Sequence, residues 1–118
     1  MSSAEIKFGE KGGVVCEIAD TPASQEWGLR GRLCLAEDEG MLFLFGYPRC
    51  IEMTMIGMSM PIDMIFVGED SRIIDFAKSI SPDLDTVACE NVSAVIEVRA
   101  GFCDSHGLEV GDGVQVAC

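Results

Sequence analysis

Short apolar runs alternate with turn residues along most of the chain. Two runs, at residues 41–45 and 62–66, are apolar at almost every position. Continuous apolar runs of this length are typical of strands buried on both faces. We therefore expect both to be core strands of one sheet. The same reading predicts further short strands at residues 6–8, 13–19, 50–56, 72–77, 93–98 and 114–117.

Cap and turn residues predict two short helices. Thr21 followed by Pro22 is a typical helix start, because threonine can cap the first turn and proline fits the first helical position. This helix is expected to end near Gly31. Residues 101–106 could form one or two helical turns closed by Gly107.

The remaining segments are predicted to be connections. Residues 46–48 are expected to end the strand that begins at residue 41, and residues 79–91 are expected to form a polar loop. In the strand at 93–98, alternation places Val95 and Glu97 on one side. The pattern favours a mainly β fold, a compact antiparallel β-barrel or sandwich of seven to eight short strands with one or two short helices.

Composition narrows the class of protein. The chain has 118 residues, so residues 1–118 are expected to form a single domain. It carries 20 acidic and 8 basic residues, a formal charge of -12, which argues against a nucleic-acid partner. No apolar run approaches the ~20 residues of a membrane span. Residues 1–5 show no signal peptide, so we expect a cytoplasmic protein, unless the chain is the mature form of an exported one.

Six cysteines are spread along the chain without a C-x-x-C pair. This spacing removes the main support for a zinc ribbon or a thioredoxin-like site. A chain of this apolar content can form a core without cross-links, so mostly reduced, buried thiols are favoured. Cys118 is expected to be exposed. We predict no cofactor.

Five segments, taken in order, resemble the family called domain of unknown function 192 (DUF192), a group of small bacterial and archaeal proteins. They are residues 19–22, 28–32, 37–45, 58–66 and 97–112. The resemblance runs from about residue 13 onward. It implies a small, mainly β fold and brings no established reaction. Many members have Trp-Met-Lys-Asn-Thr before the position of Pro61, whereas Met55-Ile56-Gly57-Met58 replaces the Met-Lys-Asn-Thr part here.

Arg30, Glu39 and Asp63 are charged residues set in these matched apolar segments. A charge beside a buried run must be paired or face solvent. One hypothesis is a polar pocket in which Arg30 holds an anionic or hydroxyl-bearing ligand and the two carboxylates orient it. The alternative is a structural ion pair or a cap at a strand end.

Methionines are concentrated in one stretch of the chain. Thioethers are soft ligands that suit Cu(I), but methionine is also an ordinary filler of irregular cores. Soft-metal binding by this run is therefore an alternative hypothesis. The residues are Met53, Met55, Met58, Met60 and Met64.

Cys103 and His106 stand three residues apart, which invites a nucleophile–base or metal pair, but no second cluster lies near them in sequence. The sequence thus favours a non-enzymatic binding or accessory domain for an unknown small polar ligand. An enzyme using Glu39 and Asp63 as paired carboxylates remains open, and the oligomeric state is not indicated.

Overall fold

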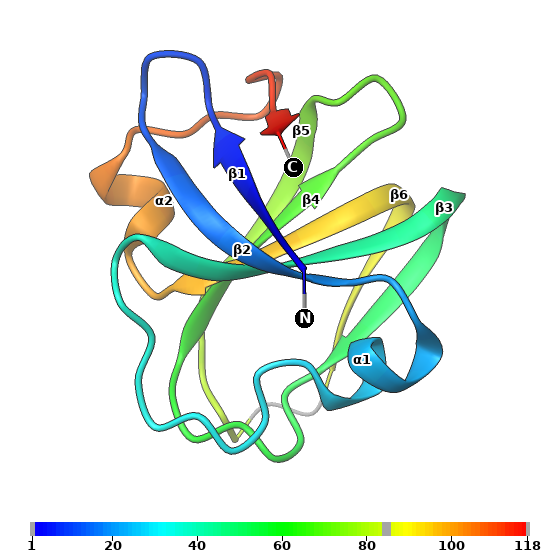
Figure 1. Ribbon diagram of the computed structural model, residues 1–118, viewed down its shortest axis with the longest axis vertical. Coiled ribbons are helices and arrows are strands. Elements are labelled where there is room, and N and C mark those ends of the chain that lie inside the picture. Colours follow the sequence, from blue (N-terminus) through cyan, green and yellow to red (C-terminus); the bar gives the residue numbers. More distant parts are fainter. Residues whose placement is uncertain (1, 84–85, 118) are drawn as a thin grey trace.

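The computed structural model describes residues 2–83 and 86–117 of the chain. The predicted exposure of Cys118 falls outside this part. Seven strands and two short helices are present in the described part (Figure 1). In chain order the elements are β1 (Ser3–Lys7), β2 (Gly13–Ala19), α1 (Pro22–Trp27), β3 (Glu39–Thr54), β4 (Ile62–Val67), β5 (Ile73–Ile80), β6 (Thr86–Arg99), α2 (Phe102–Ser105) and β7 (Gln115–Ala117).

The strands form one mixed sheet in the order β5-β4-β6-β3-β2-β1-β7. Every pair is antiparallel except β2 with β3, which run parallel. The sheet curves strongly, and Arg72 forms an isolated bridge to Gly113, but within residues 2–83 and 86–117 no continuous ladder closes a barrel. The predicted mainly β class, with seven to eight short strands and one or two short helices, is confirmed.

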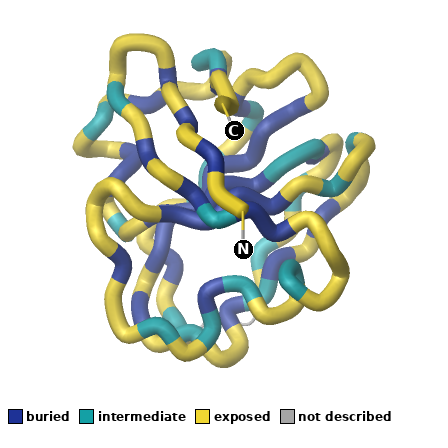
Figure 2. Tube along the Cα trace, viewed as in Figure 1, coloured by how far each residue is buried: buried dark blue, intermediate teal, exposed yellow. Residues whose placement is uncertain are grey.

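Strands β3, β4 and β6 are covered on both faces, as the apolar runs at 41–45 and 62–66 predicted. Leu42, Ile65 and Ile96 pack in one hydrophobic cluster, called here the first core cluster, together with β1, β2 and α2. Met41, Phe43 and their neighbours pack in a second core cluster on the opposite face. Figure 2 shows the buried trace running through the middle of the sheet.

The prediction that residues 46–48 end a strand is wrong. Strand β3 continues through them to Thr54, and its register against β6 shifts between Leu44 and Arg49. Gly46 adopts a φ of 83°, which only glycine takes up readily, so the chain can form an irregularity and resume pairing. The bend turns β3 into two arms that both pair with β6.

The polar loop predicted at residues 79–91 is also wrong in most of its length. Strand β5 extends to Ile80, and β6 begins at Thr86. Residues 84–85 lie outside the described part. The early start of β6 follows from the second arm of β3, whose residues Ile51–Thr54 supply backbone partners to Thr86–Cys89.

Both helices have the caps that the sequence predicted. The Thr21 side chain accepts from the Ser24 N–H, and proline occupies the first turn, but α1 is followed at once by Gly28 and does not reach Gly31. Helix α2 is followed by Gly107 at a φ of 62°. In the part of the chain that is described, no helix is long and apolar enough to cross a membrane.

Candidate functional site

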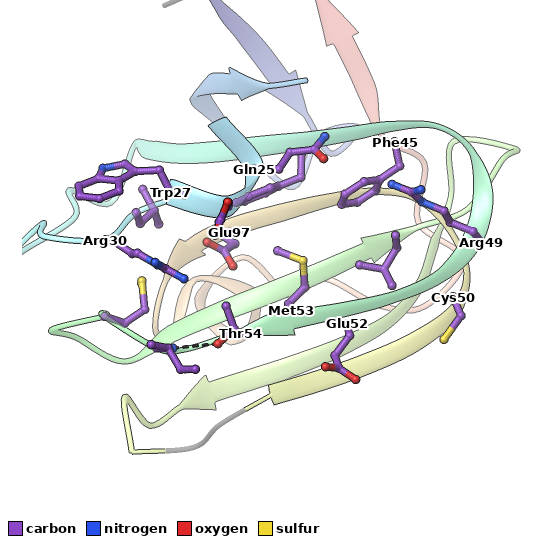
Figure 3. Close-up of a pocket in the computed structure, with 17 residues that line it drawn as sticks. Gln25, Trp27, Arg30, Phe45, Arg49, Cys50, Glu52, Met53, Thr54 and Glu97 are labelled. Carbon is purple, nitrogen blue, oxygen red and sulfur yellow. Dashed lines mark hydrogen bonds between the residues drawn. The ribbon is translucent and has the colours of Figure 1, made fainter. Parts of the chain in front are cut away.

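A pocket of about 330 Å³ opens between α1 and the two arms of β3 (Figure 3). Its size is at the lower end of the range of small-molecule sites. The wall residues form five groups along the sequence. They are Gln25–Arg30, Phe43 with Phe45, Arg49–Thr54, Ile56 with Met58, and Glu97.

Helix α1 is tied to the sheet by one side chain. The Gln25 amide donates to the Ala19 carbonyl at 3.1 Å and to the Leu44 carbonyl at 2.6 Å. These bonds link α1 to the end of β2 and to the first arm of β3. Isolated helices of six residues are not stable, so this tether and the Thr21 cap fix one wall of the pocket.

Two glycines shape the turns beside Arg30. Gly28 has a φ of 53°, and a Cβ there would lie 3.4 Å from the Phe43 ring. Gly57 has a φ of 83°, and a Cβ there would lie 3.1 Å from the aliphatic stem of Arg30. Glycine at both positions lets the turns approach the pocket closely. The side chain of Arg30 is thus guided along the turn at Gly57.

The floor of the pocket holds the carboxyl of Glu97. Its neighbours on the flanking strands are Met41 of β3 and Met64 of β4, both fully buried. Glu97 is itself only 3% exposed. Removal from water in these surroundings raises its pKa from 4.5 to about 8. Among residues 2–83 and 86–117, no hydrogen bond or ion pair reaches this carboxyl.

Cations and aromatic rings surround the entrance. The Arg49 guanidinium lies 5.3 Å from the ring centres of both Phe45 and Tyr47, close enough for cation–π attraction. Trp27 is 62% exposed at the rim. Arg30, half-buried, has no ion pair to any described carboxylate. The pocket therefore combines an apolar wall, an unpaired guanidinium and a buried acid.

The three residues predicted as a ligand site do not come together. Arg30 lines the pocket just described. Glu39 accepts from the Ala36 N–H at 3.0 Å and lines a different cavity. Asp63 is 1% exposed, and its two oxygens accept from the backbone N–H groups of Ser79 at 2.7 Å and Cys103 at 3.0 Å. A role for any of them in binding a ligand stays a prediction.

Strand alternation explains why Asp63 is separated from the other two. Ile62 and Met64 pack in the second core cluster, whereas Ile65 and Val67 pack in the first. Because side chains alternate along a strand, the Asp63 side chain lies on the face of the first core cluster. Arg30 and Glu39 lie on the side of the second core cluster. The sheet itself therefore stands between Asp63 and the pocket.

All five methionines of the predicted soft-metal run pack together. Met53, Met55, Met60 and Met64 are buried in the second core cluster, and Met58 lies against it. Met53 and Met58 also line the pocket. Packing alone accounts for their burial, while Cu(I) binding by the run stays a prediction.

Cys103 and His106 are held by the α2 turn and not by each other. The Cys103 thiol is buried, and burial beside Asp63 raises its pKa further above the ordinary value. The His106 Nδ1 lies 2.9 Å from the Phe102 carbonyl, and its ring stacks on Phe102 at 4.0 Å. Within the described residues, no three His, Cys, Asp or Glu side chains form a metal-binding group.

Sequence reasoning overlooked Glu97 as a site residue. A partial signal was present, because Glu97 stands among apolar residues in the run Val95–Val98. The alternation placed Val95 and Glu97 on one side of the strand, but only the position of β6 between β3 and β4 shows that this side is buried.

Solved structures of similar proteins share this fold. A protein of unknown function from Novosphingobium aromaticivorans has a TM-score of 0.85 and 32% identity, covering 96% of this chain and 83% of its own. A Sinorhizobium meliloti protein described as a "putative transcription regulator" has a TM-score of 0.88 and 29% identity, covering 97% of this chain and 92% of its own.

No curated protein matches the chain. The family model of DUF192, described as an uncharacterized ACR, matches residues 5–116 and thus nearly the whole sequence. The resemblance carried by the five sequence segments is confirmed, and the chain belongs to the DUF192 family.

Proposed function

We propose that this protein binds a small polar organic molecule in the pocket between α1 and β3. The observation that carries the proposal is the Glu97 carboxyl, which is buried at the pocket floor with no partner among the described residues. Buried polar groups in proteins are nearly always hydrogen-bonded. A group of this kind that faces a cavity is best explained by a partner that comes from outside the chain.

The energetics favour a ligand with a polar group at that point. The Glu97 oxygens border the open cavity, because the Ser93 hydroxyl is the one fully enclosed side-chain polar atom without a partner among the described residues. A bound molecule would replace water at this carboxyl and form hydrogen bonds with it, which are stronger where water is excluded. Nothing is lost from the structural core, since the ligand would occupy space that is already open. The arrangement is thus suited to binding and does not itself indicate a reaction.

The walls add apolar contact to this polar anchor. Phe43, Ile51 and Met53 are buried and line the pocket, while Trp27 stands exposed at its rim. Small-molecule sites typically combine such walls with a few convergent polar groups. We therefore expect a ligand with an apolar portion of a few carbon atoms and polar groups at one end.

The pocket contains its own reporters for a binding test. Met53 and Met58 line it, and their methyl groups give sharp NMR signals when methionine is labelled with ¹³C. The probes are leucine, 3-methylbutylamine, 4-methylpentanoate and xylitol, which represent a zwitterion, an amine, a carboxylate and a polyol. Saturable shifts of Met53 and Met58 with at least one probe are expected. Met60, which lines a different cavity, should stay unchanged.

A matched variant then tests the role of Glu97. Glu97→Gln keeps the size of the side chain and removes its acid, so leucine, the amine or xylitol, each of which has an N–H or O–H to donate to this carboxyl, should lose affinity if it binds. Glu90→Gln removes an exposed carboxylate outside the pocket and should leave binding as it is. Absence of pocket-specific shifts with all four probes, or equal shifts at Met60, would contradict the proposal.

A further inference from the structure

An acidic and a basic side chain line the same cavity, and neither is paired with another side chain in the described part of the chain. The Glu97 carboxyl lies at the floor, and the Arg30 guanidinium enters from the turn that follows α1. Figure 3 shows both side chains pointing into the pocket from different walls. They form no ion pair or hydrogen bond with each other, and neither has one to another described side chain.

The two side chains reach the cavity from separate elements of the fold. Glu97 is fixed in the centre of the sheet between Met41 and Met64. The Arg30 stem is held against Gly57, where even an added Cβ would come within 3.1 Å. A molecule placed between the two side chains could contact both at once.

From this juxtaposition we infer that the ligand is a small zwitterion of the amino-acid type, with its carboxylate on Arg30 and its ammonium group on Glu97. The inference rests on the proposed binding function and adds the chemical class. Guanidinium recognises a carboxylate through two parallel hydrogen bonds. A buried carboxyl is a strong partner for an ammonium group, since a charged hydrogen bond is worth most where water is excluded.

Other charged groups of the pocket are less suited to either role. Glu26 and Glu52 line it but are exposed, so water already satisfies them. Arg49 is exposed and lies against the Phe45 and Tyr47 rings. The apolar wall of Phe43, Ile51 and Met53 is left for the ligand's side chain, which favours an aliphatic one. The cavity of about 330 Å³ has room for a single residue of this kind.

The test compares leucine with two molecules that each lack one of its charges. 3-Methylbutylamine is leucine without the carboxylate, and 4-methylpentanoate is leucine without the ammonium group. Affinities are measured from the Met53 and Met58 methyl shifts at about pH 8, where Glu97 is about half ionised. Leucine should bind at least about tenfold more tightly than either relative, as one added charged hydrogen bond would give.

Two substitutions test the carboxylate contact and the ammonium contact separately. Arg30→Gln should bring the affinity for leucine down toward that of 3-methylbutylamine and leave the amine itself unaffected. Glu97→Gln should bring leucine down toward 4-methylpentanoate and leave the acid unaffected. Arg99→Gln, an exposed arginine outside the pocket, should change neither. Thermal unfolding of each variant shows that the protein is still folded.

The outcomes separate this inference from the proposed function. If xylitol, the amine or the acid shifts Met53 and Met58 while leucine binds no better, the pocket binds small molecules but the zwitterion assignment is overturned. If leucine binds most tightly but the two variants lose affinity equally for all probes, the assignment of the charges is overturned. The comparison on the unmodified protein stands even if a variant fails to fold.

Discussion

At the scale of single residues, Glu97 differs most from its surroundings. It is a carboxyl placed directly between two buried methionines, and its environment stabilises the protonated form. Most buried acids in folded proteins are paired or hydrogen-bonded. An unpaired one lowers stability whenever it must ionise, so its presence has a measurable consequence for the pH dependence of folding.

We predict that the free energy of unfolding falls as pH rises from about 4.5 to about 8. Folded Glu97 keeps its proton up to about pH 8, whereas the unfolded chain releases it near 4.5. Between these values the unfolded state binds fewer protons than the folded state, so rising pH favours unfolding. The stability that the protonated Glu97 provides is therefore fully present below about pH 4.5 and lost above about pH 8. The change should be on the order of a few kcal/mol.

Urea unfolding between about pH 5 and pH 9 measures this effect. Glu97→Gln removes the titrating group, so its profile should be flatter and the variant should be the more stable protein at the alkaline end. Glu52→Gln removes an exposed carboxylate instead and should retain the wild-type slope. Superimposable profiles for wild type and Glu97→Gln would refute the prediction.

Asp63 is also a buried carboxyl, but unlike Glu97 it is hydrogen-bonded within the protein. Its oxygens accept from the N–H groups of Ser79 and Cys103, and Ser79 is held at a φ of 49°, in the left-handed region. We predict that Asp63→Asn destabilises the protein by about 2–4 kcal/mol, because one oxygen becomes an NH₂ that faces an N–H donor. Chemical denaturation measures the loss. A change below about 0.5 kcal/mol would show that these bonds contribute little.

At the scale of elements, the bend in β3 creates the site. Had the strand ended at residue 46, its second arm would not face α1, and the pocket would lack one wall. Gly46 and the register shift that follows it allow a single strand to pair with both halves of β6. The pocket lies on the inner side of this bend, with α1 tethered across it by Gln25.

Within β3, burial should decide the cost of truncating a side chain. Leu42 is 1% exposed in the first core cluster, whereas Leu44, two residues on, is 38% exposed. We predict that Leu42→Ala costs about 2–5 kcal/mol, through lost burial and the cavity that remains. Leu44→Ala is the matched control and should cost less than about 1.5 kcal/mol. Equal denaturant midpoints for the two variants would contradict this account of the strand.

At the scale of the whole molecule, two core clusters support the sheet from both faces. The first core cluster joins β1, β2 and α2 to the central strands, and the second joins the β3 arms, the methionines and the turn after α1. Cys16 and Cys103 are buried within the first core cluster as small apolar side chains. Cys34 and Cys50 are exposed and Cys89 is half-buried, so the prediction of mostly buried thiols is wrong for the described cysteines. A core of this extent should be sufficient for folding without covalent or metal cross-links.

We therefore predict that cooperative thermal unfolding persists with both a reductant and a metal chelator present. The melting temperature should shift by no more than about 2 °C, because apolar burial and not cross-linking carries the stability. Calorimetry with and without each additive makes the measurement. Loss of the transition with reductant alone would reveal an essential disulfide, and loss with chelator alone an essential metal.

Local patterns in the sequence determined most of the elements. The apolar runs at 41–45 and 62–66, the Thr21–Pro22 start of α1 and the glycine after α2 are all decided by neighbours within a few residues. Hydrophobic periodicity and capping are local effects, so they can be read without knowing the fold. The five family segments were recognisable for the same reason.

The tertiary structure decided what depends on partners distant in the chain. The second arm of β3 and the early start of β6 exist because each supplies the other's hydrogen bonds. The grouping of Arg30 with Glu97, and not with Asp63, follows from which face of the sheet each strand residue takes. The sequence marked charges beside apolar runs, but only the pairing register shows which of them share a cavity and which are already satisfied by backbone N–H groups.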